Sequence, residues 1–419
     1  MKISLFGYGK TTRAIAKRFG PSTFFDDKVT VPQRDREGNL LLPTSLFDES
    51  RSDLEIPSPG FPPNHPLIKK AKNLISEYDL FLSDYGRKLT KNLKPDTQNQ
   101  TPPTRPPYTI WISGTNGKTT TTGMVTHLLE RRGAVSGGNI GTPLAEMDHK
   151  APIWVLETSS FTLHYTRYAK PDLYLLLPVT PDHLEWHGGE ERYLSDKLMP
   201  LGRMREGEAV LLPRALADTP SDGYKIAYEG PDSLADYFGI DIQKVRFEGA
   251  FLLDALLALG VSRILFDEVD YDAINSFEIE PHRQQPLKDS KGRVWIDDSK
   301  ATNIDAALQA LVPHAGKRVL LILGGDDKGV DPTPLMRGLK EYDVKIFAIG
   351  SNAKKLCETA EEHSIEHIFC GDLERAVKLI DKEHTRDSVA LLSPAAASLD
   401  QFDSYVQRGE IFKKAISSF

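Results

Sequence analysis

The sequence predicts three α/β domains arranged one after another. Short β-rich runs alternate with helical patterns along the 419-residue chain, which is typical of parallel sheets covered by helices. A chain of this length exceeds what one hydrophobic core usually serves. Two proline-rich breaks, at residues 95–107 and 278–286, divide it. We therefore expect domains at residues 1–94, 108–280 and 281–419, with residues 95–107 as an extended linker.

The composition is that of an ordinary globular protein. Hydrophobic residues make up 40% of the chain and charged residues 26%, while the net charge of −7 offers no basic face for nucleic acid. The longest apolar run, residues 251–259, contains Asp254 and is too short to span a bilayer. The start of the chain lacks the apolar core of a signal peptide. Cys357 and Cys370 lack metal-ligand spacing. We expect a cytoplasmic protein without a membrane partner.

The last segment shows the alternation of strands and helices most clearly. Residues 353–363 and 373–383 have helical patterns, and they lie between apolar runs that predict buried strands. These runs cover residues 294–296, 319–323, 344–349, 365–369 and 389–392.

A glycine-rich loop in the middle segment predicts a phosphate site. Residues 108–113 are a strand candidate and residues 120–132 are a helix candidate. In the turn between them, backbone N–H groups and the positive end of the helix would converge on an anion. Lys118 would reach the β- and γ-phosphates, and the Thr119 hydroxyl would bind Mg²⁺. The expected ATP-binding residues of the loop are Gly114, Thr115, Asn116, Gly117, Lys118, Thr119 and Thr120.

Two further residues follow predicted strands of the same segment. Glu157 ends the apolar run 153–157, and His183 follows the run 173–179. Taken alone, each would be a surface or capping residue. Because carboxylate oxygens suit Mg²⁺ and a phosphate loop lies upstream, we interpret Glu157 as a metal ligand, with His183 beside it.

The first segment begins with a glycine turn that imitates a dinucleotide-binding fingerprint. Gly7 and Gly9 are present, but Thr12 stands where the third glycine belongs. An NAD-dependent oxidoreductase is therefore a weak alternative, which NADH fluorescence would test. A loop of this kind can also bind a nucleotide diphosphate.

The loop Gly114-Thr115-Asn116-Gly117-Lys118-Thr119-Thr120 resembles the ATP loop of the Mur ligases and folylpolyglutamate synthetases. Only two residues separate its glycines, where a general phosphate loop has four. The resemblance implies a Rossmann-like nucleotide-binding first domain, a central P-loop ATPase-type domain and a Rossmann-like C-terminal domain. It also implies ATP and a pair of Mg²⁺ ions as cofactors, and a monomer.

Lys197 acquires a role only from this resemblance. Taken alone, it would be an exposed helix lysine; the family pattern places a carbamylated lysine at about this distance after the histidine. The implied catalytic residues are Lys118, Glu157, His183 and Lys197. The implied metal ligands are Thr119, Glu157, His183 and Lys197 as a carbamate.

The third segment resembles the D-glutamate-adding branch of the family most closely. Pro281-His282-Arg283, residues 297–303 (DDSKATN), residues 324–328 (GGDDK) and residues 393–402 (SPAAASLDQF) match its motifs. The resemblance implies that Arg283 and Asp298 contact ATP. A helix is expected to begin near Leu399, with Ser398 as its N-cap. The implied D-glutamate contacts are Thr302, Lys328, Ser398, Leu399 and Tyr405.

The resemblance assigns the second substrate, UDP-N-acetylmuramoyl-L-alanine, to the first domain. Its implied contacts are Lys10, Thr11, Asp27, Lys28, Ser58, Pro59 and Gly60, together with Asn139 of Asn139-Ile140-Gly141 in the middle segment. The choice between Asp26 and Asp27 stays open. The expected activity joins D-glutamate to this substrate through an acyl phosphate, in peptidoglycan precursor synthesis.

Two stretches depart from the family pattern. Residues 249–255 stand where an HNxxN stretch, with an asparagine near the adenine, is usual, and Asp254 replaces its second asparagine. Phe161-Thr162 replaces a Phe-Gln pair. The remaining alternatives are another Mur ligase, a folylpolyglutamate synthetase, the NAD-dependent enzyme, and an inactive nucleotide-binding regulator.

Overall fold

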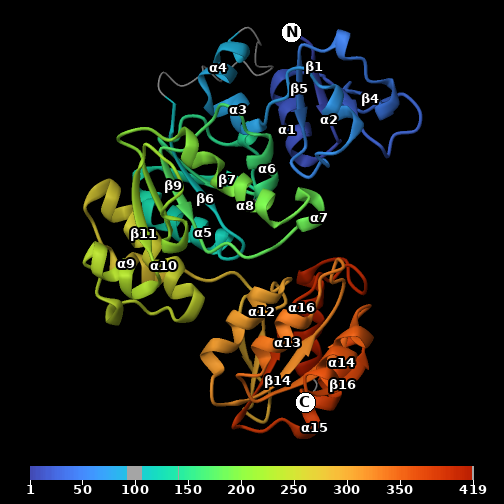
Figure 1. The fold of residues 1–419 in the computed structure, drawn as a ribbon, viewed down its shortest axis with the longest axis vertical. Helices are drawn as coiled ribbons and strands as arrows, with labels where there is room; N and C mark the ends of the chain where they lie inside the picture. Colours follow the sequence, from blue (N-terminus) through green and yellow to red (C-terminus); the bar gives the residue numbers. More distant parts are fainter. Residues whose placement is uncertain (92–105, 140, 418–419) are drawn as a thin grey trace. The chain divides into compact units, whose positions relative to one another are not determined.

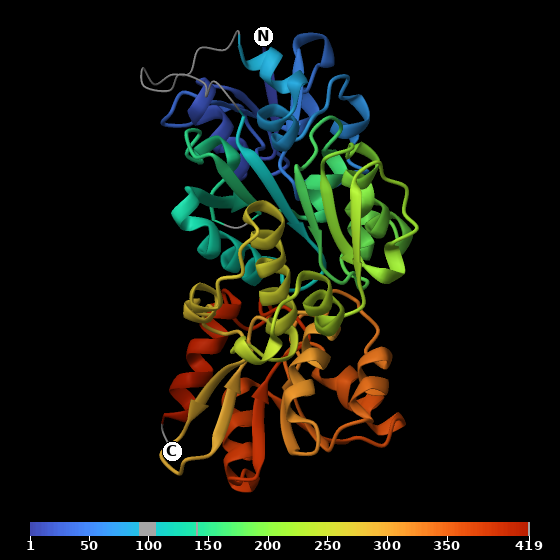
Figure 2. The same ribbon diagram turned by 90° about the vertical axis from the view of Figure 1, so that its left-hand side faces the viewer.

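The computed structural model describes residues 1–91, 106–139 and 141–417, which form three sheets (Figures 1 and 2). The chain divides into two compact units: residues 1–247 with 251–277, and residues 248–250 with 278–419. The first unit holds two sheets and the second unit holds one. The predicted fold of three α/β domains is confirmed. The domain limits remain predictions, and most of the linker 95–107 lies outside the described residues.

The N-terminal sheet is mostly parallel, in the order β3-β4-β2-β1-β5. The central strand β1 pairs in parallel with β2 and β5, while β3 is antiparallel to β4. The strands are β1 (Ile3–Phe6), β2 (Thr23–Phe25), β3 (Gln33–Arg34), β4 (Leu40–Leu42) and β5 (Leu54–Pro57). The helices are α1 (Lys10–Phe19), η1 (Thr44–Leu46), η2 (Glu49–Arg51), α2 (Pro66–Lys70), α3 (Glu77–Leu82) and α4 (Asp84–Thr90).

The central sheet has the order β11-β10-β9-β6-β8-β7, and each neighbouring pair is parallel. Its strands are β6 (Tyr108–Ser113), β7 (Ala134–Gly138), β8 (Ile153–Glu157), β9 (Leu173–Leu176), β10 (Ala209–Pro213) and β11 (Tyr224–Tyr228). Its longer helices are α5 (Lys118–Leu129), α6 (Ser160–Tyr165), α7 (Leu184–His187), α8 (Glu190–Leu198), α9 (Pro231–Phe238), α10 (Gly249–Phe266) and α11 (Tyr271–Ser276). Short 3₁₀ turns lie at η3 (Glu130–Arg132), η4 (Leu144–Glu146), η5 (Met199–Arg203), η6 (Arg214–Leu216) and η7 (Ile242–Lys244).

The C-terminal sheet has the order β12-β13-β17-β14-β15-β16 and is parallel except for the edge strand β12. Its strands are β12 (Gln285–Lys288), β13 (Val294–Asp297), β14 (Arg318–Leu323), β15 (Val344–Ile349), β16 (Glu366–Gly371) and β17 (Ser388–Leu392). The helices are α12 (Ile304–Leu311), η8 (Val312–His314), α13 (Thr333–Leu339), α14 (Ala353–Glu362), α15 (Leu373–Glu383) and α16 (Tyr405–Ile416). All five strands predicted in this segment are present.

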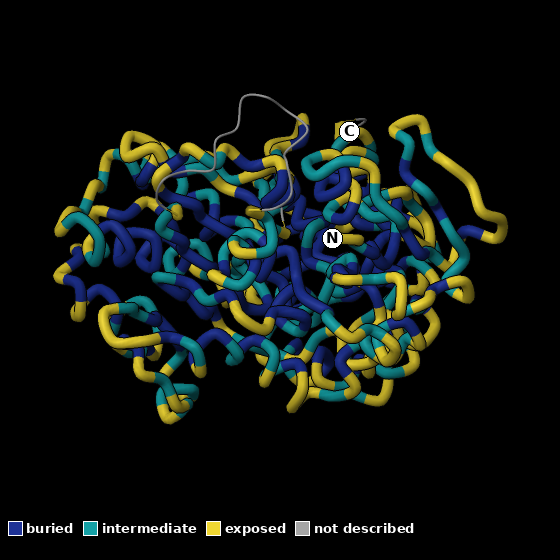
Figure 3. Tube along the Cα trace, turned by 90° about the horizontal axis from the view of Figure 1, so that it is seen from above, coloured by how far each residue is buried: buried dark blue, intermediate teal, exposed yellow. Residues whose placement is uncertain are grey.

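Alternation along the strands explains why helices cover both faces of this sheet. Leu321 and Leu323 of β14 pack with α12, α13 and α14, whereas Leu320 and Ile322 pack with α15 and α16. Successive side chains of a strand point to opposite faces, so an apolar run produces two cores. Along the described chain as a whole, buried stretches of the trace alternate with exposed ones (Figure 3).

Helix α10 is longer than the apolar run 251–259 suggested. Its 18 residues have a mean hydropathy of 1.8, which is enough by length and composition to cross a membrane, so the expectation that this region is too short was wrong. Half of the stretch is buried inside the protein. Asp254 is 3% exposed and accepts a hydrogen bond from the Thr121 hydroxyl, which is characteristic of a core helix.

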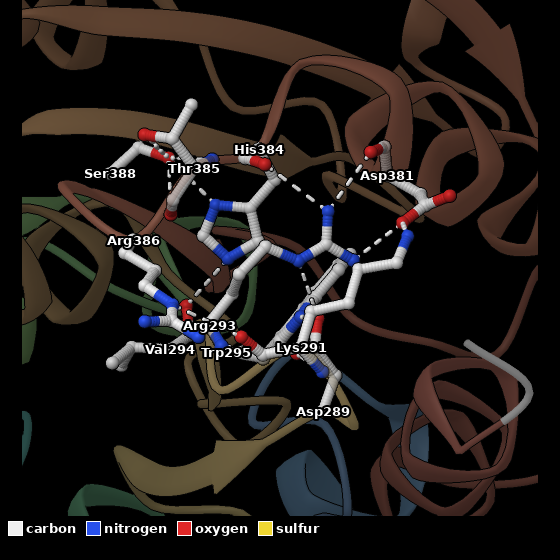
Figure 4. A network of polar contacts seen from close by, with 10 residues as sticks. All are labelled: Asp289, Lys291, Arg293, Val294, Trp295, Asp381, His384, Thr385, Arg386 and Ser388. Atoms are coloured by element: carbon white, nitrogen blue, oxygen red, sulfur yellow. Dashed lines mark hydrogen bonds and ion pairs between the residues drawn. The ribbon is translucent and has the colours of Figure 1, made fainter.

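A buried polar network closes one end of the C-terminal sheet (Figure 4). The Arg293 guanidinium forms ion pairs with Asp289 and Asp381 and donates to the backbone carbonyls of Asp381 and His384. These contacts join the start of β13 to the end of α15. Because its charge is paired and its donors are used, Arg293 is tolerated with a side chain only 6% exposed.

We expect Arg293→Met to lower the free energy of unfolding by about 3–5 kcal/mol, because it leaves the buried Asp289 carboxylate without its cation. The Lys291 side chain is 52% exposed and also pairs with Asp381. Lys291→Ala is therefore a matched control, expected to cost less than about 1 kcal/mol. Urea denaturation of both variants measures the difference. Equal losses in the two variants would contradict this account.

Candidate active site

The phosphate loop lies between β6 and α5, as the sequence predicted. Gly117 has a φ of 80° and is the N-cap of α5, and Gly114 has a φ of 143°. A Cβ at Gly114 would lie 2.5 Å from the Leu177 Cβ, and one at Gly117 would lie 2.6 Å from an Asp254 carboxylate oxygen. Both positions therefore require glycine for its backbone conformation and for close packing.

Side chains of the loop fix its shape. The Lys118 ammonium donates to the carbonyl oxygens of Gly114 and Thr115, at 3.0 and 2.6 Å. The Thr115 hydroxyl donates to the Thr180 carbonyl at 2.8 Å, which ties the loop to the chain after β9. The first turn of α5 directs backbone N–H groups toward the loop, the arrangement that binds phosphate.

Glu157 lies beside the loop because β8 pairs with β6, with Glu157 opposite Ile112. The Thr119 hydroxyl donates to one carboxylate oxygen of Glu157 at 2.8 Å, and the Asn139 amide donates to the other at 2.6 Å. Glu157 is only 2% exposed. A hydroxyl and a carboxylate side by side are hard oxygen donors, so this pair fits Mg²⁺. Asn139, predicted as a substrate contact, also belongs to this group.

Lys197 is buried, at 1% exposure, and its ammonium donates to the Gly114 carbonyl at 2.7 Å. The interpretation as an exposed helix lysine is therefore wrong. Burial lowers the pKa of Lys197 well below its usual range, and the Lys118 charge lowers it further. Lys118 and Lys197 thus share one carbonyl acceptor. A neutral amine is the form that reacts with carbon dioxide, so this environment suits the predicted carbamate.

His183 precedes α7 and adopts the left-handed conformation, with a φ of 52°. Its ring lies 4.8 Å from the Phe161 ring, between centroids, and its side chain is 35% exposed. Phe161, which matches the first residue of the usual Phe-Gln pair, therefore fixes one side of the histidine.

A cavity of about 210 Å³ lies between the first two sheets. Lys10, Thr11, Pro59 and Asn139, four of the predicted substrate contacts, line it. The Lys10 ammonium donates to the Gly141 carbonyl across this cavity. The structure thus brings together residues from the first and middle segments that the sequence could associate only by resemblance; Ile140 lies outside the described residues.

The remaining predicted substrate residues lie elsewhere in the first unit. The Asp27 carboxylate contacts Thr44 and His65, outside the lining of the cavity. Asp26 instead accepts the backbone N–H groups of Tyr8 and Lys28, so it stabilises the glycine turn. Ser58 packs directly against this turn, and Gly60 accepts a hydrogen bond from the Trp186 indole at 3.2 Å.

Glu77 also lines this cavity and was not anticipated from the sequence, where it looks like an ordinary helix residue. One of its carboxylate oxygens accepts the Ala145 N–H at 3.2 Å. Burial raises the pKa of Glu77 to about 8. The group is therefore mainly a neutral acid at pH 7.

Glu77 should make the folded protein less stable as pH rises from about 5 to about 8. In that range the unfolded chain has released the Glu77 proton and the folded chain has kept it, so higher pH favours unfolding. In the wild type this effect lowers the free energy of unfolding by on the order of 3 kcal/mol, and we expect Glu77→Gln to abolish that loss. Urea denaturation at pH 6 and pH 8.5 measures it, with exposed Glu37→Gln as control. If the free energy of unfolding of Glu77→Gln changed with pH as much as that of the wild type, the raised pKa of Glu77 would be refuted.

In the second unit, the predicted segments meet at the carboxyl ends of the strands. Asp298 accepts a hydrogen bond from the Ser393 hydroxyl at 2.7 Å, which joins the 297–303 and 393–402 segments. Burial raises the pKa of Asp298 to about 7. Backbone hydrogen bonds between Asp326 and Ala397 join the 324–328 loop to the same place. Arg283 contacts the Glu280 carboxylate at 3.3 Å.

Arg408 was not anticipated and holds two of these segments together. It is fully buried, donates to the Ser299 carbonyl at 2.7 Å and donates to the Ala396 carbonyl at 3.2 Å. Lys328, the last residue of the 324–328 loop, has a left-handed φ of 51°. Thr302 is half-buried just before α12.

The helix expected near Leu399 is absent from the described residues of this region. The Ser398 carbonyl instead accepts the N–H groups of Gln401 and Phe402 and closes a turn. The helix starts at Tyr405, because the Ser404 side chain caps it by accepting the Gln407 N–H. Ser398 is buried, whereas Leu399 is 70% exposed.

Known proteins match both the sequence and the fold. A model of the Mur ligase middle domain matches residues 112–250. A Campylobacter jejuni protein named UDP-N-acetylmuramoylalanine–D-glutamate ligase is 50% identical over 100% of both chains. A Helicobacter pylori protein of the same name is 44% identical over 99% of both. The structure of MurF ligase from Thermotoga maritima in complex with ADP covers 99% of this chain and 97% of its own, with 16% identity and a TM-score of 0.59, which shows a common fold.

The chain belongs to the Mur ligase family of ATP-dependent acid–amino-acid ligases. Its full-length relatives place it, within that family, among the UDP-N-acetylmuramoylalanine–D-glutamate ligases. The dinucleotide-enzyme interpretation of Gly7 and Gly9 is thereby set aside, and the Thr12 hydroxyl donates to the Gly7 carbonyl where the third glycine would be.

Proposed function

We propose that the protein adds D-glutamate to UDP-N-acetylmuramoyl-L-alanine with hydrolysis of ATP to ADP and phosphate. The observation that carries this proposal is the group formed by the phosphate loop, Glu157 and Lys197 in a chain half identical to a ligase of that name. The γ-phosphoryl group moves to the substrate carboxylate and ADP leaves. The D-glutamate amine then attacks the acyl carbon, its proton is lost, and phosphate leaves.

Positive groups would stabilise the phosphoryl transfer. Lys118 and the loop N–H groups bind the phosphate oxygens, and Arg283 from the second unit is the proposed further ATP contact, with Asp298 on the ribose. Such transfer depends mostly on positioning and electrostatics. Thr119, Glu157, His183 and carbamylated Lys197 would hold a pair of Mg²⁺ ions, which supply further positive charge at the phosphates.

The two organic substrates would bind in different units. The cavity lined by Lys10, Thr11, Pro59 and Asn139 would take the UDP-sugar, with Asp27, Lys28, Ser58 and Gly60 as outer contacts. In the second unit, the Lys328 ammonium would pair with a D-glutamate carboxylate. The other proposed contacts of D-glutamate are Thr302, Ser398, Leu399 and Tyr405.

Release of ADP in assays that omit one component at a time tests the proposal. We expect ADP formation only when ATP, Mg²⁺, UDP-N-acetylmuramoyl-L-alanine and D-glutamate are all present. L-Glutamate and meso-diaminopimelate are the matched amino-acid controls. Equal ADP release with meso-diaminopimelate, or with a folate substrate, would assign the protein to another branch of the family.

A further inference from the structure

Three metal-binding side chains converge outside the predicted Mg²⁺ ligands. His164 comes from α6, His187 from the end of α7 and Asp196 from α8. The Nδ1 atoms of His164 and His187 lie 2.9 and 2.7 Å from the same oxygen, Oδ2 of Asp196. One ligand atom from each residue lies within 4.8 Å of the other two. None of the three is among the predicted Mg²⁺ ligands.

The cluster is poorly accessible to water. The side chains of His164, His187 and Asp196 are 16%, 0% and 14% exposed. Within the part of the chain that the structure describes, Asp196 pairs with the two imidazoles. The Asp196 carboxylate is therefore balanced by hydrogen bonds from these partners. Because it is shielded from water, it would attract a divalent cation more strongly than an exposed carboxylate would.

The surroundings fix the orientation of the His187 ring. Its Nε2 lies 3.0 Å from the Ser160 hydroxyl oxygen, and its ring is stacked on Phe161 at 5.6 Å between centroids, with Tyr193 at its edge. A histidine that binds a metal through one nitrogen usually donates its other N–H to a protein oxygen, which fixes the ring. Ser160 already occupies that position for a metal bound at Nδ1.

We propose that His164, His187 and Asp196 form a binding site for one divalent transition-metal ion of the Zn²⁺ type. Each neutral imidazole would move its single proton from Nδ1 to Nε2 and offer the Nδ1 lone pair. For His187 the relocated N–H would donate to Ser160. Asp196 supplies an anionic oxygen, and water completes a four-coordinate site. Binding requires a small rotation of the Asp196 carboxylate, since its oxygen now lies between the two Nδ1 atoms.

The ligand chemistry separates this site from the predicted Mg²⁺ site. Two imidazole nitrogens and one carboxylate suit Zn²⁺ or Co²⁺, whereas Mg²⁺ prefers oxygen ligands and retained water. Side-chain geometry alone defines this site, so binding of the ion does not depend on the proposed ligase activity. A bound ion would link α6, α7 and α8, and it would stabilise the folded state by mass action.

Equilibrium dialysis of the full-length protein against Zn²⁺, with millimolar Mg²⁺ and no nucleotide, tests the proposal. We expect one tightly held Zn²⁺ per chain and a rise in melting temperature. His164→Ala and Asp196→Asn should each lose this ion. His367→Ala, a half-buried histidine of β16, is the matched control and should keep it. His183→Ala should also keep it, which distinguishes this site from Zn²⁺ held at the Mg²⁺ ligands.

Co²⁺ provides a readout that does not depend on activity. A low-coordinate site with two imidazoles should give visible absorption bands that His164→Ala abolishes and His367→Ala retains. Retention of the same amount of Zn²⁺ by wild type, His164→Ala and Asp196→Asn would overturn the proposal. So would failure of the wild type to bind any ion, which would leave a hydrogen-bonded cluster that only holds the three helices.

Discussion

Lys118→Ala is expected to lower kcat by about a thousandfold or more, because Lys118 is the charged group of the phosphate loop. A fixed cation that stabilises charge in phosphoryl transfer contributes about 10³–10⁵ in rate where it has been removed in comparable sites. Lys118 is the first residue of α5. Its ammonium already lies over the loop, 2.6 and 3.0 Å from two carbonyl oxygens of the loop. Little reorganisation is then needed to meet a phosphate.

The measurement is steady-state ADP release, with the melting temperature as a check on folding. Lys150→Ala replaces an exposed lysine of the same unit and should behave as wild type. Lys118→Arg keeps the charge but not the compact ammonium, so it should recover only part of the rate. A Lys118→Ala variant that retains a tenth of the wild-type kcat would show that the loop does not hold the reacting phosphates.

The strands that position the site could be predicted because their sequence signals are local. The first predicted strand, Tyr108–Ser113, is followed by a glycine, and the second, Ile153–Glu157, ends at a polar residue. Both strands occur with those limits. Their pairing, which places Glu157 next to Thr119, follows from the parallel α/β arrangement. The pattern could not show that Asn139 would complete the group.

Residues whose role depends on tertiary packing escaped prediction. Glu77 and Arg408 lie in helices and carry no motif; what matters is that Glu77 faces a cavity and that Arg408 reaches two distant carbonyls. Asp254 could be recognised only as a departure from the family pattern. The structure shows why a small acceptor is accommodated there, since Asp254 packs against Gly117 and accepts from Thr121.

The prediction of a helix near Leu399 was wrong because two nearby serines can each cap a helix. Ser398 and Ser404 are both N-cap residue types, and only Ser398 was considered as a cap from the sequence. The turn closed by the Ser398 carbonyl leaves Leu399 exposed, so the chain reaches Ser404 before a helix begins. Cap residues identify where a helix can start, but tertiary contacts decide between two of them.

Lys197→Met should produce opposite changes in activity and stability. The variant keeps most of the apolar stem that fills the buried position but removes the amine. Burying an ammonium is costly, and the lowered pKa of Lys197 shows that the fold bears this cost. We therefore expect the free energy of unfolding to stay the same or rise, by about 1 kcal/mol, while kcat falls by about a hundredfold or more. A variant that loses activity only because it unfolds would show the reverse pattern.

The pH dependence of stability supplies a second test of the same residue. Because the folded-state pKa of Lys197 is lowered, the unfolded chain binds more protons between that value and the ordinary lysine pKa. Lys197 should therefore contribute a rise in stability with pH across this window, opposite in sign to the contribution of Glu77, and Lys197→Met should lack that contribution. Lys17→Ala, which replaces a helix lysine with a 70% exposed side chain, should keep it.

Carbon dioxide distinguishes a carbamate from an amine that is only buried. If the neutral Lys197 amine adds carbon dioxide and releases a proton, the product is an anion suited to the Mg²⁺ ions that the site would hold. Wild-type activity should then fall in carbon-dioxide-free buffer and return with bicarbonate. A ¹³C-bicarbonate label should appear in the wild-type NMR spectrum and be absent from Lys197→Met. Activity that is indifferent to carbon dioxide would leave Lys197 as an amine held by the Gly114 carbonyl, and the metal site would have to be completed by other oxygen ligands.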